Sequence, residues 1–195
     1  MSTSAESTGV SRRHLPGDLA MWFFILAELS VFAILILVFA VTQALKPQMF
    51  SESRLLLNTS TGLAMTLSLL TAGLFAALAQ EQVRRSRSRQ GAVFLLMALL
   101  AASVYVMLKL TEYRHLLASG LGMEHNTFFT LYWILTGFHF LHVLLGMVIF
   151  GWLADRCRRG LHNASKRSGF ESGVLYWHMV DLIWVMLFPL VYVLS

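Results

Sequence analysis

Long apolar runs recur along the chain, and short polar segments separate them. Each run holds few charged side chains, and the runs lie near residues 19–42, 56–80, 91–113, 127–153 and 171–194. A helix needs about 20 apolar residues to cross a hydrocarbon core that is ~30 Å thick. Each run is therefore long enough for one transmembrane helix, and the pattern predicts an all-α integral membrane bundle of five spans.

The composition indicates a lipid environment rather than a soluble core. Of the 195 residues, 57% are hydrophobic and only 13% are charged, with a mean hydropathy of +0.67. This balance lies outside the usual range for soluble domains. A Ser/Thr-rich stretch precedes the first run, which is too long for a secretory signal. We therefore interpret residues 1–18 as a flexible polar tail and residues 19–195 as a single transmembrane domain.

Basic residues are distributed unevenly between the two sides of the predicted bundle. The side that holds the N-terminus carries eleven of the 15 Lys and Arg residues: Arg12, Arg13, Arg84, Arg85, Arg87, Arg89, Arg156, Arg158, Arg159, Lys166 and Arg167. The other side carries four: Lys46, Arg54, Lys109 and Arg114. Cytoplasmic loops are enriched in Lys and Arg, so we expect a cytoplasmic N-terminus and a periplasmic C-terminus in a bacterial inner membrane. Orientation also accounts for the net charge of +5, which argues against nucleic-acid binding.

Small side chains recur every four residues in the second run, at Ala64, Ser68, Ala72 and Ala76. A spacing of four keeps residues near one face of a helix, and small residues allow two helices to approach closely in a membrane. We therefore predict that this face is buried against a neighbouring helix.

Ionisable side chains also occur within the runs, where a charge is costly unless it has a partner or a cavity. They are Glu28, Glu112, His139, His142, His178 and Asp181. At 1.5 Å per residue, Glu28, His142 and Asp181 each lie roughly 14 to 15 Å from the cytoplasmic end of their span. We therefore expect a buried polar layer, with His–carboxylate hydrogen bonds between the fourth and fifth spans. Lys109 is placed to pair with Glu112 or to extend towards water.

These polar residues leave several functions open. His139 and His142 share one helical face and, with His178 and Asp181, form a candidate metal-ligand set. His142 and His178 are also candidate haem ligands, although intramembrane histidines more often bond to neighbouring helices. A relay through Glu28, His142 and Asp181 would suit a small proton or ion channel or transporter. The lack of an internal repeat counts against a transporter.

Several stretches resemble subunit III of the haem-copper respiratory oxidases. They are Trp22 to Phe32, Asn58-Thr59, Glu112-Tyr113, Thr136 to Gly146, and Tyr176 to Asp181. The likeness covers nearly the whole chain, and the last two stretches are its most specific part. The five-span form of this family includes quinol oxidase subunits and the NorE proteins associated with nitric oxide reductase. The opening from Pro16 to Trp22, and Lys109 where many oxidase members carry glutamine, are most similar to NorE.

The resemblance implies a subunit that has no haem or metal of its own and holds phospholipids between its helices. It also implies packing on a catalytic partner, either a nitric oxide reductase or a haem-copper-type oxidase. We expect an accessory, non-catalytic subunit in electron transport, linked to denitrification and otherwise to oxygen reduction. The implied residue roles are structural hydrogen bonding, lipid headgroup contact or support of proton uptake. They apply to the positions that match the family's polar residues: Glu28, Glu112, His139, His142, His178 and Asp181.

Overall fold

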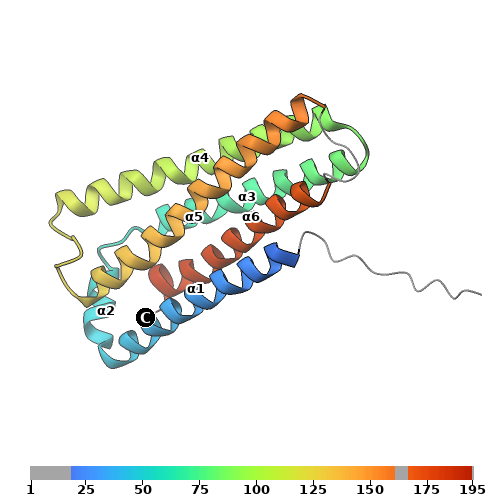
Figure 1. The fold of residues 1–195 in the computed structure, drawn as a ribbon. Coiled ribbons are helices and arrows are strands. Elements are labelled where there is room, and N and C mark those ends of the chain that lie inside the picture. The colour runs from blue at the N-terminus through green and yellow to red at the C-terminus, as the bar shows by residue number, and fades with distance from the viewer. Residues whose placement is uncertain (1–18, 161–166, 195) are drawn as a thin grey trace, which may run out of the picture.

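The computed structural model describes residues 19–160 and 167–194, and the predicted tail 1–18 lies outside the described residues. Within these residues all regular structure is helical (Figure 1). The long helices are α1 (Leu19–Leu45), α3 (Thr59–Arg84), α4 (Ser88–Ala118), α5 (Thr127–Arg158) and α6 (Arg167–Phe188). Each of these 5 helices holds a segment long and apolar enough to cross a membrane. The prediction of five spans is confirmed.

The helix ends depart from the predicted runs for local reasons. α4 extends beyond 91–113 at both ends, and α5 continues past residue 153. These last turns extend beyond the hydrocarbon core into the polar headgroup region. A helix can carry charged residues there and need not be apolar. α3 begins at Thr59 because the Asn58 side chain caps it, accepting the N–H of Thr61 at 3.1 Å.

The pattern did not predict the short helix α2 (Pro47–Arg54), which joins α1 to α3. Its sequence mixes polar and apolar residues without a clear period, so hydropathy alone gives no signal. Pro47 occupies the first helical position, where its missing N–H costs no intrahelical hydrogen bond.

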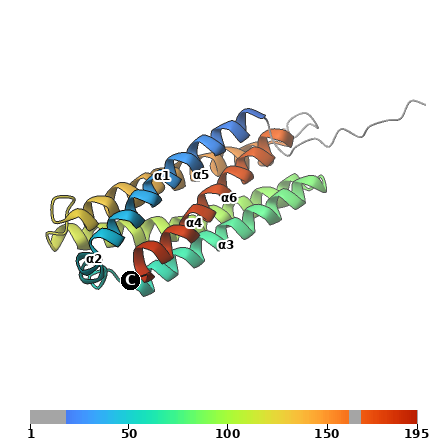
Figure 2. The ribbon, with the colours of Figure 1, turned by 90° about the horizontal axis from the view of Figure 1, so that it is seen from below.

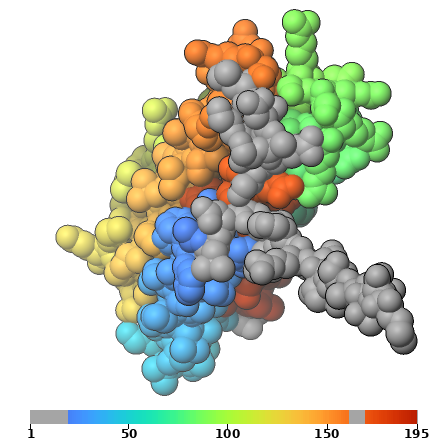
Figure 3. Space-filling view, turned by 45° about the vertical axis from the view of Figure 1, so that its right-hand side comes forward, coloured from blue at the N-terminus to red at the C-terminus, as the bar shows by residue number. Residues whose placement is uncertain are grey.

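α6 occupies the middle of the bundle, where it contacts α1, α3 and α5 (Figures 1 and 2). α1 lies at the edge and is visible on the surface as the blue patch in Figure 3. Only 17% of the α1 membrane segment is buried within the chain, against 56% for α6. The described ends of the chain lie at opposite ends of the bundle (Figure 1), as an odd number of spans requires.

The buried face of α3 is rotated away from the predicted row of small residues. Ala72 and Ala76 are buried, Ser68 is half-buried and Ala64 is exposed. A row spaced by four residues drifts by about 40° per step around a helix with 3.6 residues per turn. The prediction was therefore wrong for Ala64. The face that packs against α4 and α6 follows the helical period instead, through Gly62, Leu69, Ala76 and Val83.

Candidate functional site

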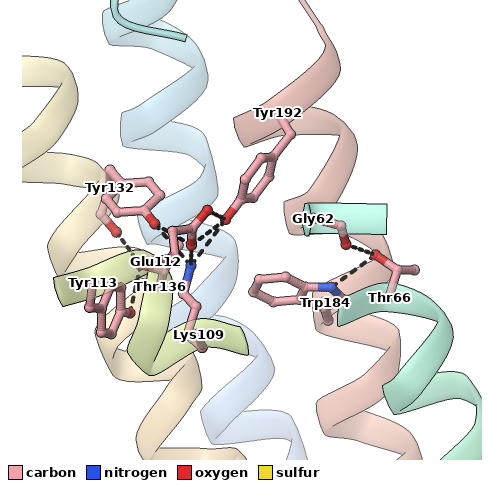
Figure 4. Close-up of polar contacts among 9 residues, drawn as sticks. All are labelled: Gly62, Thr66, Lys109, Glu112, Tyr113, Tyr132, Thr136, Trp184 and Tyr192. Atoms are coloured by element: carbon pink, nitrogen blue, oxygen red, sulfur yellow. Dashed lines mark hydrogen bonds and ion pairs between the residues drawn. The ribbon is translucent and has the colours of Figure 1, made fainter. Parts of the chain in front are cut away.

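A closed polar cluster lies where α4, α5 and the π-helical turn η2 (Pro189–Val193) meet (Figure 4). The Lys109 ammonium donates to Glu112 Oε2 at 2.7 Å, and to the hydroxyls of Tyr132 and Tyr192 at 3.0 and 3.1 Å. Both tyrosine hydroxyls donate to the Glu112 carboxylate, at 2.7 and 2.9 Å. Lys109 is 0% exposed. The Glu112 carboxylate balances the buried charge of Lys109, and hydrogen bonds satisfy the N–H groups of the ammonium. These contacts make a buried ion pair tolerable.

The turn η2 brings Tyr192 into this Lys109 cluster. Pro189 lacks the N–H that would continue the α-helical ladder, so α6 ends before it and the backbone widens into a π turn. Arg54 of α2 donates to the carbonyls of Leu190 and Val191 at 3.1 and 3.0 Å. Burial lowers the pKa of Arg54 from its ordinary value. The guanidinium thus provides hydrogen-bond donors for carbonyl groups of the turn that carries Tyr192.

A first His–carboxylate pair joins α1 to α5. His142 Nε2 lies 3.0 Å from Glu28 Oε2, and His142 Nδ1 lies 2.8 Å from the carbonyl oxygen of Phe138. A carbonyl only accepts, so Nδ1 carries a proton. At Nε2 the imidazole and the Glu28 carboxyl form a hydrogen bond in which either group can be the donor. The side chains of Glu28 and His142 are 20% and 10% exposed, so the pair lies near the surface of the bundle.

A second His–carboxylate pair lies within α6. His178 Nδ1 is 3.3 Å from Asp181 Oδ2, three residues along one face of the helix. The Asp181 carboxylate lies so close to Gly73 of α3 that a Cβ at Gly73 would collide with it. The His178 side chain is 43% exposed, although the apolar segment that contains it runs from residue 169 to residue 193. Lipid tails cannot hydrogen-bond to an imidazole, so this exposure within an apolar segment is costly unless a polar group covers it.

The expected polar layer therefore divides into two separate pairs. Among these residues, the expected hydrogen bond between the fourth and fifth spans is absent: His142 pairs with Glu28, and Asp181 pairs with His178. The expectation rested on depth along each helix, and depth does not fix the direction in which a side chain points. The fourth and fifth spans are joined instead by the Tyr176 hydroxyl, which donates to the carbonyl of His142 at 3.2 Å.

His139 belongs to neither pair. It is 0% exposed and lies against the ring of Trp184, with ring centroids 5.0 Å apart. Neither of its ring nitrogens has a hydrogen-bond partner among residues 19–160 and 167–194. Among the described residues, no three His, Cys, Asp or Glu side chains gather as metal ligands would. The interpretation of His139, His142, His178 and Asp181 as one ligand set has no support in this geometry.

Sequence reasoning identified Glu112 and Lys109 but not the tyrosines that complete their cluster. The predicted spans place Tyr132 and Tyr192 near the side of the membrane opposite the N-terminus, where Glu112 also lies. An estimate of depth along each span, made for hydroxyl groups as well as for charged groups, would have placed these two tyrosines together with Glu112. Arg54 gave no such signal, because its role depends on the π turn that it caps.

Known proteins identify the family to which this arrangement belongs. A family model described as cytochrome c oxidase subunit III matches residues 16–195. The chain belongs to this family. The matched residues include the Lys109 cluster and both His–carboxylate pairs, so the whole candidate site lies within the subunit III homology. The resemblance carried by the signature stretches is confirmed.

Relatives within the subunit III family differ in how much of their length the chain spans. The cytochrome c oxidase subunit 3 of Thermostichus vulcanus is 41% identical over 80 residues, which is 40% of each chain. The haem-copper oxidase subunit I+III of Aeropyrum pernix is 28% identical over 89% of this chain but only 22% of its own length. The probable quinol oxidase subunit 3 of Staphylococcus saprophyticus is 26% identical over 98% of this chain and 97% of its own. The chain is thus similar to an entire quinol oxidase subunit and to a small part of the fused protein.

Proposed function

We propose that the chain is an accessory, non-catalytic subunit that packs on the catalytic subunit of a haem-copper-type complex in the bacterial inner membrane. The observation that carries the proposal is the match to the subunit III family over residues 16–195. The exposed His178 imidazole supports it, because a polar group inside a span is costly without a protein partner. The name of the Aeropyrum pernix relative, subunit I+III, supports it further, since it joins both subunits in one chain.

Nitric oxide reductase is the catalytic partner that we propose, which links the chain to denitrification. This part rests on Lys109 and on the opening from Pro16 to Trp22, which are similar to the NorE proteins. A cytochrome c or quinol oxidase is the second candidate, and the names of the relatives favour it.

Co-purification tests both levels of this proposal. The tagged chain is extracted in mild detergent from cells grown with nitrate or with oxygen, and the proteins that accompany it are identified. We expect the haem-bearing catalytic subunit of a nitric oxide reductase. Recovery of an oxidase catalytic subunit instead would support the accessory role but identify a different partner. Recovery of the chain without any haem protein from either culture would contradict the proposal.

Matched variants show whether the second His–carboxylate pair, His178 with Asp181, contributes to this association. His178→Leu should lower the recovery of the catalytic subunit, because it removes the exposed imidazole of α6. Leu141→Ala is the control, since it alters a 61% exposed apolar side chain on α5. Equal recovery with both variants would exclude His178 from the contact.

We also propose that the arginine-rich end of the bundle faces the cytoplasm, following the enrichment of basic residues there. Alkaline phosphatase is active only when exported, so its fusion after Leu194 should be active. Its fusion within the connection between α3 and α4 should be inactive. The reverse pattern would invert the orientation.

A further inference from the structure

Arg54 of α2 is buried without an acidic partner. The residue is 8% exposed, yet it forms no ion pair in the part of the chain that the structure describes. By contrast, ion pairs of 2.7 to 3.3 Å join the exposed residues Arg84, Arg85 and Arg159 to carboxylates. A charge that is taken out of water without a countercharge is costly. The positive charge of Arg54 is therefore left uncompensated within the described residues.

Hydrogen bonds use only one edge of the Arg54 guanidinium. Nε and Nη2 donate to the carbonyls of Val191 and Leu190, at 3.0 and 3.1 Å. The buried Nη1, which carries two further N–H groups, has no hydrogen-bond partner among the described residues. Capping of η2 thus explains the Nε–Nη2 edge but not the donors that remain. These donors lie on the Nη1–Nη2 edge, where two parallel N–H groups match the two oxygens of a carboxylate.

A cavity of about 350 Å³ adjoins Arg54 where α2, η2 and the first turn of α3 meet. It lies at the end of the bundle that holds α2 and the described C-terminal end (Figure 1). Among the described residues that line it, Arg54 alone is charged. Leu55 and Val193 on its wall are 85% and 50% exposed, so the cavity is open at the surface. The hydroxyls of Ser51 and Thr59 also line it, but both already donate to backbone carbonyls.

We propose that this cavity, the Arg54 pocket, binds a carboxylate group. The two oxygens accept from the Nη1–Nη2 edge, and one negative charge balances the single guanidinium. A phosphate group carries a charge of about −1.5 to −2 near neutral pH, which would exceed the charge of one arginine. The carboxylate belongs to a small soluble anion or to an Asp or Glu side chain of an adjoining subunit, and both sources present the same two oxygens. Binding to the chain alone is independent of the proposed function.

Titration of the full chain in detergent with sodium acetate, against sodium chloride at equal ionic strength, tests the pocket. The midpoint of thermal unfolding should rise with acetate as binding to a single site requires. Arg54→Gln should weaken acetate binding roughly tenfold or more, because it removes charge-assisted hydrogen bonds. Arg114→Gln is the control, since it removes an exposed arginine near the end of α4 on the same side of the bundle. It should change the acetate affinity by less than about twofold.

Several outcomes would overturn the proposal. Acetate that raises the midpoint no more than chloride does would leave no carboxylate site. Equal losses of affinity in Arg54→Gln and Arg114→Gln would show that only general charge attracts acetate, and tighter binding of inorganic phosphate would replace the carboxylate by another anion.

A second pair of variants applies if Arg54→Gln fails to fold because η2 loses its capping donors. Ser51→Trp places an indole in the pocket and leaves Arg54 unchanged, whereas the control Ser51→Ala keeps the pocket open. Acetate binding should be lost in the first variant and retained in the second. Retention in both would place acetate outside the Arg54 pocket and refute the proposal.

The assembled complex distinguishes the two sources of the carboxylate, and this step alone rests on the proposed function. If an adjoining subunit supplies the carboxylate, the complex should not bind acetate, and Arg54→Gln should lower the recovery of the catalytic subunit. If the source is a soluble anion, the complex should bind acetate as the chain alone does, with unchanged recovery. Failure of the isolated chain to bind acetate would refute the pocket and leave the accessory role intact.

Discussion

The Lys109 cluster and the two His–carboxylate pairs place charge inside the same bundle in opposite ways. In the cluster, side chains from α4, α5 and η2 satisfy one another, and Lys109 is 0% exposed. In the pairs, Glu28 and His178 retain 20% and 43% of their side-chain surface. A closed network holds helices together, whereas a half-open pair leaves hydrogen-bonding capacity for a molecule outside the chain. The first feature therefore stabilises the fold, and we propose that the second, besides joining helices, also contributes to assembly with a partner.

The largest effect should come from opening the closed Lys109 cluster. Lys109→Met leaves the Glu112 carboxylate as an uncompensated buried charge, which typically costs about 3–5 kcal/mol. Thermal unfolding of the purified chain in detergent measures the loss.

The double variant Lys109→Met/Glu112→Leu is the matched control, because it removes both charges together. Replacing a whole buried ion pair with apolar residues is often close to neutral, so much of the lost stability should return. A double variant as unstable as the single one would show that the cluster does not act through charge balance.

Disturbing the contact between α3 and α6 at Asp181 should have the next largest effect on stability. Gly73→Ala introduces a Cβ that collides with the Asp181 carboxylate, so either this carboxylate must move from its place beside His178 or α3 and α6 must separate. Overpacking of this kind costs about 1–3 kcal/mol. Gly137→Ala is the control, because nothing lies within 4 Å of its added Cβ. Chemical unfolding should show destabilisation only for Gly73→Ala, and similar curves for both variants would argue against this close contact.

A smaller loss should follow disruption of the half-open pair between α1 and α5. His142→Leu removes the hydrogen bond to Glu28, and such interhelical bonds are worth roughly 1 kcal/mol in membranes. Ser30→Ala provides the control on α1, because within the part of the chain that the structure describes the Ser30 hydroxyl bonds to the carbonyl of Leu26 in its own helix. Protease susceptibility of α1 should rise in the first variant and stay constant in the second. The absence of any difference would separate this pair from the docking of α1.

The smallest effect on the isolated chain should come from His178, the most exposed member of the pairs. His178→Leu replaces a 43% exposed side chain and loses a long contact of 3.3 Å to Asp181, so stability should change by less than the roughly 1 kcal/mol expected at His142. Its effect should appear in the assembled complex, where one interhelical hydrogen bond of roughly 1 kcal/mol corresponds to an affinity change of roughly fivefold. Titration of the chain against its purified partner measures this change. A large loss of stability in the chain alone would move His178 from assembly to fold.

The sequence predicted the parts of the structure that depend on one helix at a time. Apolar length determined the five spans, and charge identified Glu28, His142 and Asp181 at similar depths. The pairing of these residues was not predictable, because it depends on how each helix is rotated about its axis. Depth was correct for Glu28 and His142, whose bond is 3.0 Å, but the partner of Asp181 proved to be its own helix neighbour.

The same limit explains the errors at α3 and at the Lys109 cluster. A spacing of four suggested Ala64 as a packing residue, but the true helical period turns it outwards. Tyr132 and Tyr192 resemble ordinary interfacial tyrosines in sequence. Only the packing of α5 and η2 against α4 shows that their hydroxyls complete the Lys109 and Glu112 ion pair.

We propose that this subunit III family member supports a catalytic partner and carries no redox centre of its own. Visible absorption and metal analysis of the chain, purified alone and with its partner, test this proposal. The chain alone should show neither haem absorption nor stoichiometric iron or copper, and the complex should show haem that stays with the catalytic subunit when the two are separated. Stoichiometric haem or copper in the isolated chain would rule out an accessory subunit without a redox centre.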